Sequence, residues 1–345
     1  MLSGKSLLKA AAGLACLLFT TSAMAQQTEL TVIVYGGSFE EGWKKAVIQP
    51  FEKAYPDIKV KIATGLTQQT IAMMRAQKSD VKIDVIMMDE VGAAQAKGEG
   101  LYEPLVPSKV PNIEKLYPQF RIAGDTYTKF MYVAQALTWN KETVKTKPDS
   151  WMAMWDPAYK GKIAVPDIQT SHGSFFLLTA ADMTGGSIKN TDSGFELIKK
   201  LKPSILTFYT QHAQVAQLFT QGEIVMTSWT SDRAQAAIDG GAPLAWTVPK
   251  EGAYIIDSTI GIARGSRNTE AALKYVNFVL GDSAQAANAR YTYLAPVNSE
   301  VKLAAEIAAK LPVADLPRLK PADWDFVTTV RPQWTQRWTR EIAAN

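Results

Sequence analysis

Apolar and polar positions alternate along the first part of the chain in a way that predicts strands and helices in turn. Residues 30–35 form a run of mostly β-branched residues and predict a strand. The next segment, 39–55, has large apolar residues at helical spacing and predicts a helix. Residues 59–62 alternate as a strand, 68–77 predict a helix, and 85–88 predict a buried strand. Two strand–helix–strand units in succession predict an α/β fold with a parallel sheet and helices on its faces.

The second half of the chain predicts another α/β unit that begins after Trp139. Two α/β units with a cleft between them are the simplest assembly of this pattern, and ligands on such sheets bind at the carboxyl ends of strands. The expected elements are a capped short helix at 146–155, strands at 162–166, 222–229 and 258–263, helices at 232–238 and 269–280, and further helical material to the carboxyl terminus.

The amino terminus has the pattern of a secretory signal peptide. Lys5 and Lys9 precede an apolar run at 10–19, and small residues at 23 and 25 flank Met24 as at a cleavage site. We therefore expect residues 1–25 to be removed and the mature chain to begin near Gln26, outside the cytoplasm. No later stretch approaches the roughly 20 apolar residues that a transmembrane helix needs.

Composition narrows the functional classes. Charged residues make up 20% of the chain and hydrophobic residues 47%, as in folded globular proteins. The formal charge of +4 is nearly neutral for this length and gives no argument for nucleic-acid binding. The single cysteine, Cys16, lies in the expected signal peptide, so we expect no disulfide in the mature chain. His172 and His212 are the only histidines, and no metal site or cofactor is expected.

Several segments together resemble a known family. These are residues 150–161, 221–229, 248–252, 257–258 and 293–298. In order and spacing they are similar to the extracellular solute-binding proteins of bacterial ABC importers, in the branch that includes spermidine/putrescine receptors. The resemblance implies a type II periplasmic-binding fold, with 26–136 plus 259–345 as lobe one and 137–258 as lobe two. It also implies a monomeric periplasmic receptor, not an enzyme, whose lobes close on a small molecule for delivery to permease and ATPase subunits.

The resemblance also implies which residues contact the ligand. Polyamine receptors neutralise ammonium groups with carboxylates and cover methylene chains with aromatic rings. Trp229 falls where such a receptor has its stacking ring, and Asp167 and Asp257 fall where it has acids. An amine-bearing or cationic solute is therefore expected. Further candidates at strand ends are Ser38, Phe39, Asp89, Glu90, Asp232 and Tyr254.

Each acid also has a structural interpretation. Asp89 and Asp257 could cap local backbone, and Asp232 could be the first-turn acid of its helix. The chain also departs from the polyamine pattern, since Ile255 stands where an aromatic residue is usual and Gln169 stands near Asp167 in place of a second acid.

Other ligands and classes stay open at this point. Arg233 could pair with the carboxylate of a zwitterion such as a γ-amino acid, and thiamine would use the same ring and acid. Tyr291 and Tyr293 resemble the paired tyrosines of ferric-iron receptors, although Thr292 separates them, and they would share a face on a strand. An exported hydrolase is the remote alternative, because Ser171 and His172 are adjacent but no nucleophile-elbow motif is present.

Overall fold

The computed structural model describes residues 27–344 except 37, 66 and 123–125, so the expected signal peptide lies outside the described residues. An eleven-stranded mixed sheet runs through the molecule in the order β2-β1-β3-β10-β5-β8-β6-β7, with β4 and β11 on β10 and β9 on β5. Within the described ranges, no helix has the length and apolar character that a bilayer span requires.

The first lobe is built on the parallel strands that the sequence predicts. Strand β1 (Thr28–Val34) lies between β2 (Ile58–Thr64) and β3 (Val85–Asp89) and is parallel to both. The predicted helix at 39–55 is one continuous helical segment with a π-helical turn at its centre. Its parts and the following helices are α1 (Ser38–Trp43), η1 (Lys44–Ile48), α2 (Gln49–Ala54), α3 (Thr67–Ala76) and α4 (Glu90–Gly98).

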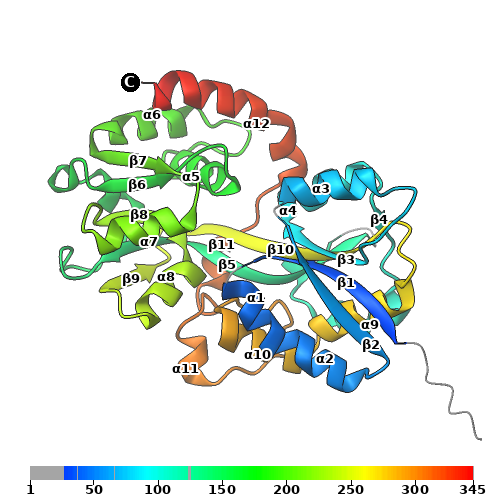
Figure 1. Cartoon of the computed structure of the whole chain (residues 1–345). Helices are drawn as coiled ribbons and strands as arrows, with labels where there is room; N and C mark the ends of the chain where they lie inside the picture. Colours follow the sequence, from blue (N-terminus) through cyan, green and yellow to red (C-terminus); the bar gives the residue numbers. More distant parts are fainter. Residues whose placement is uncertain (1–26, 37, 66, 123–125, 345) are drawn as a thin grey trace, which may run out of the picture.

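Two long strands cross from one lobe to the other. Strand β5 (Tyr127–Asn140) is antiparallel to β10 (Ala253–Ala263) along its first half and antiparallel to β8 along its second half. Figure 1 shows β5 and β10 side by side between the lobes. The sequence predicts only the end of β10 and does not predict β5, whose residues are buried on both faces and show no alternation.

The second lobe repeats the parallel arrangement. Strand β6 (Ile163–Pro166) lies between β7 (Ile205–Tyr209) and β8 (Met226–Thr230) and is parallel to both. Strand β9 (Leu244–Thr247) is antiparallel to β5. The helices of this lobe are α5 (Ser171–Asp182), α6 (Asp192–Leu201), α7 (His212–Thr220) and α8 (Ser231–Asp239). Helices α5, α7 and α8 begin just after β6, β7 and β8, so their first turns lie at the carboxyl ends of those strands.

The chain then returns to the first lobe and ends on the second. Most of the returning elements pack on lobe one, among them α9 (Thr269–Val279) and α10 (Asp282–Thr292), and α11 (Ala305–Ala308) and β11 (Leu319–Lys320) follow. Strand β4 (Tyr102–Glu103), from earlier in the chain, is antiparallel to the end of β10. The last helix, α12 (Trp324–Trp338), continues into η9 (Thr339–Ala343). The short 3-10 turns are Pro107–Lys109, Pro111–Lys115, Pro118–Phe120, Trp151–Trp155, Pro157–Tyr159, Lys202–Ser204 and Leu316–Arg318.

The last helix departs from the expected division of the chain, in which 259–345 belonged to lobe one. Trp338 lies edge-on to Phe208 of β7 at 5.6 Å, and Arg337 is paired with Asp192 of α6. Figure 1 shows α12 running beside α6. The boundaries at 136/137 and 258/259 stay a prediction, but the end of the chain contacts lobe two.

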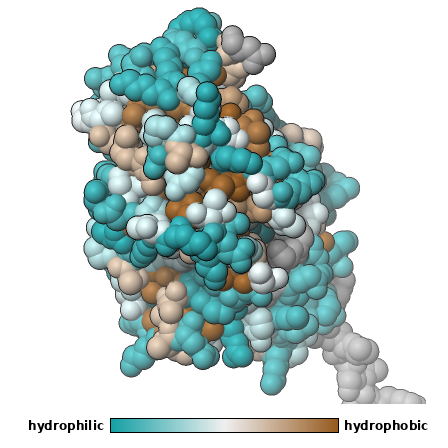
Figure 2. Space-filling model, turned by 90° about the vertical axis from the view of Figure 1, so that its left-hand side faces the viewer, coloured by the Kyte–Doolittle hydropathy of each residue, from teal (hydrophilic) through white to brown (hydrophobic). Residues whose placement is uncertain are grey.

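Most apolar side chains that the structure describes are in the core. Trp43, Trp151 and Trp338 are fully buried, and large exposed apolar side chains are confined to Val106, Met152, Leu206 and Tyr291 in the described part of the chain. On the face in Figure 2, apolar residues form patches that hydrophilic residues interrupt. Burial at roughly 25 cal/mol per Å² of apolar surface is the main favourable contribution to such a fold.

Candidate functional site

A small cavity lies between the two lobes. Phe39 of α1 and residues 291–293 at the end of α10 line it from lobe one, and Asp232, Arg233 and Ala236 of α8 line it from lobe two. Its volume is ≈ 80 Å³. A cavity needs about 10–15 Å³ to hold one water, so this space is several times larger than a single-water site. The cavity therefore fits a short solute held by both lobes.

Asp232 is the acid that faces this cavity. It lies in the first turn of α8, as one interpretation expects, and its side chain is 13% exposed. Its Oδ2 lies 3.4 Å from Arg233 Nε. Its Oδ1 is buried and has no hydrogen-bond partner among the described residues. Because an unpartnered buried carboxylate oxygen is costly, this atom is a candidate acceptor for a ligand donor.

Phe39 supplies the ring on the opposite side of the cavity. It is 6% exposed and stacks on Trp43 with ring centroids 5.4 Å apart, while Tyr35 meets its edge at 5.3 Å. This packing fixes the ring, and an aromatic ring near an acid favours a cationic ligand group. Ser38 begins α1, but its side chain lies outside the described set.

Trp229 is not one of the residues that line this cavity and lies inside the core of lobe two. Its ring is 3% exposed and belongs to the cluster around Tyr209 and Phe219. Its Nε1 donates a hydrogen bond to His212 Nδ1 over 2.9 Å. Trp229, the ring that was expected to stack on the ligand, is therefore buried and orients His212 through this hydrogen bond.

Two histidines, which we call the histidine wall, lie at the starts of α5 and α7. The rings of His172 and His212 meet edge-on with centroids 4.9 Å apart. Burial and the neighbouring His212 lower the pKa of His172 to about 3, and the charges of Asp232 and Arg233 act on it in opposite directions. Burial and Arg233 lower the pKa of His212 to about 4. Both rings are therefore neutral at pH 7, and His212 carries its proton on Nε2.

Asp257 lies in a separate, buried cluster on the crossing strands. Its Oδ2 is 2.6 Å from Lys129 Nζ of β5, and Lys129 also lies 2.9 Å from Glu90 Oε2 of α4. The side chains of Lys129, Asp257 and Glu90 are 6%, 3% and 15% exposed. Burial and the nearby Asp257 carboxylate raise the pKa of Glu90 to about 8, although Lys129 opposes them. The charge of Asp257 is thus met by a lysine of the protein itself.

Asp89 and Asp167 both accept hydrogen bonds from local backbone. Asp89 is the N-cap of α4 and its Oδ1 accepts from Gly92 N over 2.9 Å, which confirms the capping interpretation. Asp167 follows β6, and its Oδ1 accepts from Gln169 N over 2.8 Å. Both residues lie at the carboxyl ends of strands that face the other lobe, but each carboxylate already has a backbone partner.

Tyr254 does not line the cavity between the lobes. Its hydroxyl donates to Asp182 Oδ2 over 2.9 Å. Asp182 is the last residue of α5, whereas the histidine wall lies at the first turn of that helix. Tyr254 therefore contacts the end of α5 that is remote from Asp232.

The iron and hydrolase alternatives find no support in this geometry. Tyr291 and Tyr293 lie at the carboxyl end of α10 and not on a strand as expected, and Tyr293 donates to Asp239 Oδ2 over 2.7 Å. Among the described residues, no three His, Cys, Asp or Glu side chains gather as metal ligands would. Ser171 and His172 are consecutive residues in the first turn of α5, and no hydrogen bond between their side chains is present in the described structure.

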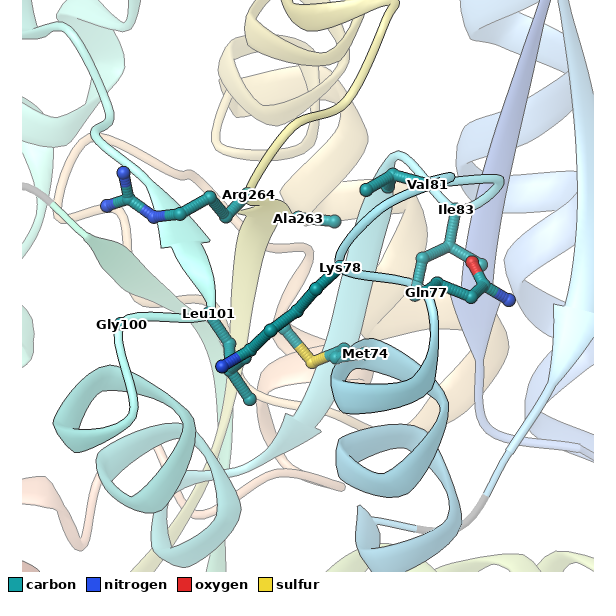
Figure 3. A pocket seen from close by; sticks show the side chains of 9 residues that line it. All are labelled: Met74, Gln77, Lys78, Val81, Ile83, Gly100, Leu101, Ala263 and Arg264. Carbon is teal, nitrogen blue, oxygen red and sulfur yellow. The ribbon is translucent and has the colours of Figure 1, made fainter.

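A second cavity of ≈ 220 Å³ lies in lobe one, away from the lobe–lobe cleft. Met74, Ile83 and Leu101 give it an apolar floor, and Figure 3 shows the Lys78 side chain extending past Met74 toward Leu101. Ile83 precedes β3 and Ala263 ends β10, so this cavity is at the amino end of the parallel strands. Ligands of open α/β sheets bind at the other end, so we do not assign it to the site.

Two charged residues near the cleft are absent from the sequence-based predictions. Lys129 lies in β5, and Arg331 lies in α12, where its Nη2 donates to the Gln169 carbonyl over 2.7 Å. Neither has a local signal, because the partners of Lys129 and Arg331 are distant in the chain. Only the folded structure shows that Lys129 pairs with Asp257 and that Arg331 contacts the loop that contains Gln169.

Comparison with known proteins places these features in a family context. The family profile of the bacterial extracellular solute-binding proteins matches residues 46–314. The Spermidine/putrescine-binding periplasmic protein of Salmonella typhimurium is 25% identical over 231 residues, which span 65% of this chain and 66% of that relative, just under two thirds. The Putative 2-aminoethylphosphonate-binding periplasmic protein of the same species is 23% identical over 272 residues, 76% of each chain.

A solved structure agrees with the sequence comparisons. The crystal structure of an ABC transporter protein from Clostridium perfringens is similar with a TM-score of 0.78 and 26% identity, over 91% of this chain and 99% of that one. The expected α/β, two-lobed binding-protein fold is thereby confirmed.

Proposed function

Because the chain belongs to the bacterial extracellular solute-binding protein family, we propose that it is the exported receptor of an ABC importer for a small amine-bearing solute. It binds the solute between its lobes and delivers it to permease and ATPase subunits in the membrane, without breaking a bond. The signal-peptide pattern of residues 1–25 and the periplasmic relatives support a periplasmic location.

One observation supports the amine in particular: Asp232 lines the cavity between the lobes, and its buried Oδ1 has no partner in the described structure. An ammonium group is a donor that matches it in charge, and hydrogen bonds to charged groups contribute about 1.5–3 kcal/mol. Phe39 adds a ring face or edge from lobe one. Spermidine/putrescine-binding relatives agree with this chemistry.

Closure of the two lobes on the solute follows from the contacts that both lobes make with it. The solute contacts α8 of lobe two and α1 and α10 of lobe one, so it stabilises the closed state over an open one by its contacts to both. The crossing strands β5 and β10 are the elements about which the lobes would move.

The experiment is titration calorimetry of the mature protein, freed of carried-over solute by partial unfolding, with short amines that include 1,4-diaminobutane and 4-aminobutanoate. Asp232→Asn should weaken amine binding by roughly 10- to 100-fold, as expected for a lost charged hydrogen bond. Asp167→Asn is the matched control, since that carboxylate already accepts a backbone N–H, and it should change affinity little. Absence of amine binding to the wild type, or equal affinity in Asp232→Asn, would overturn the proposal.

A further inference from the structure

We propose that Tyr293, Asp239 and Lys310 form a latch between the lobes that holds the solute cavity closed. Asp239 ends α8 of lobe two, Tyr293 is the C-cap of α10 of lobe one, and Lys310 follows α11 on the returning segment. The effect of the latch on affinity rests on the proposed receptor function, but its effect on lobe closure does not.

The three side chains of the latch meet at the Asp239 carboxylate. The Tyr293 hydroxyl donates to Asp239 Oδ2 over 2.7 Å, and Lys310 Nζ pairs with the same oxygen. The Lys310 ammonium also lies 5.9 Å from the centre of the Tyr293 ring, within the range of a cation–π contact. Two groups from outside lobe two therefore converge on one oxygen of α8.

Lobe two orients this carboxylate from its other side. Asp239 Oδ1 accepts from Gln235 Nε2 over 2.8 Å, and Gln235 Oε1 accepts from Trp246 Nε1 of β9 over 3.1 Å. The Gln235 side chain is buried, so this chain of hydrogen bonds connects Asp239 to the body of the lobe. A carboxylate that is already oriented loses less conformational freedom when Tyr293 binds it.

Lobe one fixes the chain on both sides of Tyr293. Before it, α10 packs closely on α1, since a Cβ at Gly42 would lie 2.9 Å from the Tyr291 carbonyl oxygen. After it, Ala295 exchanges two backbone hydrogen bonds with Tyr132 of β5. Tyr293 itself has φ 58°, in the left-handed region that residues with a Cβ seldom adopt. The phenol is therefore presented to α8 from a fixed backbone.

The latch borders the cavity between the lobes. Tyr293 lines that cavity, as do Asp232 and Ala236 of α8. Residues three or four apart lie on the same face of a helix, so Asp239 continues the face of Asp232 and Ala236 by one turn. A solute in the cavity and the latch beside it therefore favour the same closed arrangement of the lobes.

Both hydrogen-bonding groups have the protonation state that the latch needs at neutral pH. The hydrogen bonds from Lys310 and Tyr293 lower the pKa of Asp239, so the carboxylate is ionised. Burial and the bond to Asp239 raise the pKa of Tyr293 to about 12, so the hydroxyl keeps its proton. The Asp239 side chain is 27% exposed, and such ion pairs contribute little. We therefore expect loss of the latch to reduce the closed-to-open ratio by roughly three- to tenfold, as for one hydrogen bond.

The test combines a measurement of lobe closure with one of affinity. The only cysteine of the chain lies in the expected signal peptide, so the mature protein can be labelled at Lys53→Cys on α2 and Lys200→Cys on α6. Figure 1 shows these helices on opposite lobes. Single-molecule energy transfer between the two dyes then gives the closed fraction, and calorimetry gives the affinity for 1,4-diaminobutane and 4-aminobutanoate.

The variants separate the latch from direct contacts to the solute. Asp239→Ala removes the latch at a residue that does not line the cavity. If the solute-free protein is mostly open, affinity should fall by roughly three- to tenfold; if it is mostly closed, its open fraction should rise by that factor. Tyr293→Phe should add nothing to Asp239→Ala, because both remove the same bond. Asp239→Asn, which keeps an acceptor, should lose less. Tyr117→Phe is the control, at a tyrosine that packs on Phe120 away from the cavity.

The outcomes also separate the latch from the proposed function. If Asp239→Ala changes neither the closed fraction nor the affinity, the latch is wrong. If Tyr293→Phe weakens binding and Asp239→Ala does not, the hydroxyl acts on the solute and the latch is again wrong. If no amine binds the wild type, the proposed function fails. The closed fraction of the solute-free protein then decides on the latch alone, since a lower value in Asp239→Ala supports it and an equal value overturns it.

Discussion

Asp232 and Asp257 have similar hydrogen bonding and ion pairing, but the groups around them differ. Each has one buried carboxylate oxygen without a partner in the described structure and one oxygen paired with a cation. Asp257 lies 2.6 Å from Lys129 inside a buried cluster that also contains Glu90. Asp232 lies 3.4 Å from Arg233 and faces a cavity between the lobes.

The difference teaches that the neighbours of a strand-end acid decide its role. A close, buried lysine already compensates Asp257, so a ligand ammonium would have to displace it, and breaking a buried ion pair is strongly unfavourable. Asp232 lines the cavity and has an unpartnered buried oxygen, so an ammonium group there would displace no such lysine. The predictions below challenge this contrast, from the largest expected effect to the smallest.

Trp229→Ala tests whether the ring near Asp232 belongs to the core or to the ligand. Because the ring is buried among Tyr209 and Phe219, its removal should destabilise the solute-free protein by about 3–5 kcal/mol in urea unfolding. Tyr291→Ala, at a ring that is 47% exposed, is the control and should change stability by less than about 0.5 kcal/mol. Unchanged stability of Trp229→Ala together with lost solute binding would restore the stacking role.

Lys129→Met tests the buried cluster directly. It leaves the buried Asp257 carboxylate without its counter-charge, so the free energy of unfolding should fall by about 3–5 kcal/mol. Lys59→Met, which breaks an exposed pair with Glu52, should cost only about 0–1 kcal/mol. The contrast between the two acids is lost if Lys129→Met is as stable as the wild type and binds amines more tightly.

The titration of Glu90 should make the free energy of unfolding depend on pH, with an effect of intermediate size among these predictions. Its pKa is about 8 in the folded protein, against the ordinary glutamate value of 4.5, so between these values the folded state holds a proton that the unfolded chain lacks. Stability from this group is therefore present below about pH 4.5 and is lost as the pH rises toward 8. Glu90→Gln should flatten this slope in unfolding titrations. An equal slope in the variant would place the titration elsewhere.

The two histidines of the histidine wall should give a pH dependence of stability with the opposite sign to that of Glu90. His172 and His212 have folded pKa values of about 3 and about 4, below the ordinary histidine value of 6.5. The unfolded chain thus binds protons first on acidification, and stability falls from about pH 6.5 toward pH 3–4. His172→Gln should reduce this loss, as measured by urea unfolding at pH 4 and 7. A variant that loses as much stability as the wild type over this range would contradict the neutral assignment.

His212→Phe should have the smallest of these effects. It leaves the Trp229 indole N–H without its acceptor, which costs about 1–3 kcal/mol. Tryptophan fluorescence should shift because the hydrogen bond of that indole is lost. His212→Gln, which keeps an acceptor, should recover part of the loss, and equal stability of the two variants would show that the hydrogen bond contributes little.

Local patterns predicted some of the elements that are amphipathic or bounded by turns, although the amphipathic helix α6 was not predicted. The strands near residues 30–35 and 85–88 and the helix at 39–55 agree with β1, β3 and the α1–α2 segment. The prediction missed β5 and α5, because both are buried on nearly all sides and lack the periodicity that marks a half-buried element.

The site was only partly predictable for a related reason. Asp232 and Phe39 were recognised from their place at strand ends, and both line the cavity. The lysine that pairs with Asp257 and the arginine beside Gln169 come from distant segments, so no spacing in the sequence indicates them. Trp229 had the expected position along its strand, but the side to which its ring packs depends on α7.

The most direct test of the central claim is a crystal structure of the protein with the tightest-binding amine of the panel. We expect the ammonium nitrogen at about 2.7–3.2 Å from Asp232 Oδ1. We also expect the Lys129–Asp257 pair to stay intact. An ammonium bound to Asp257, with Lys129 displaced and Asp232 unoccupied, would contradict the account.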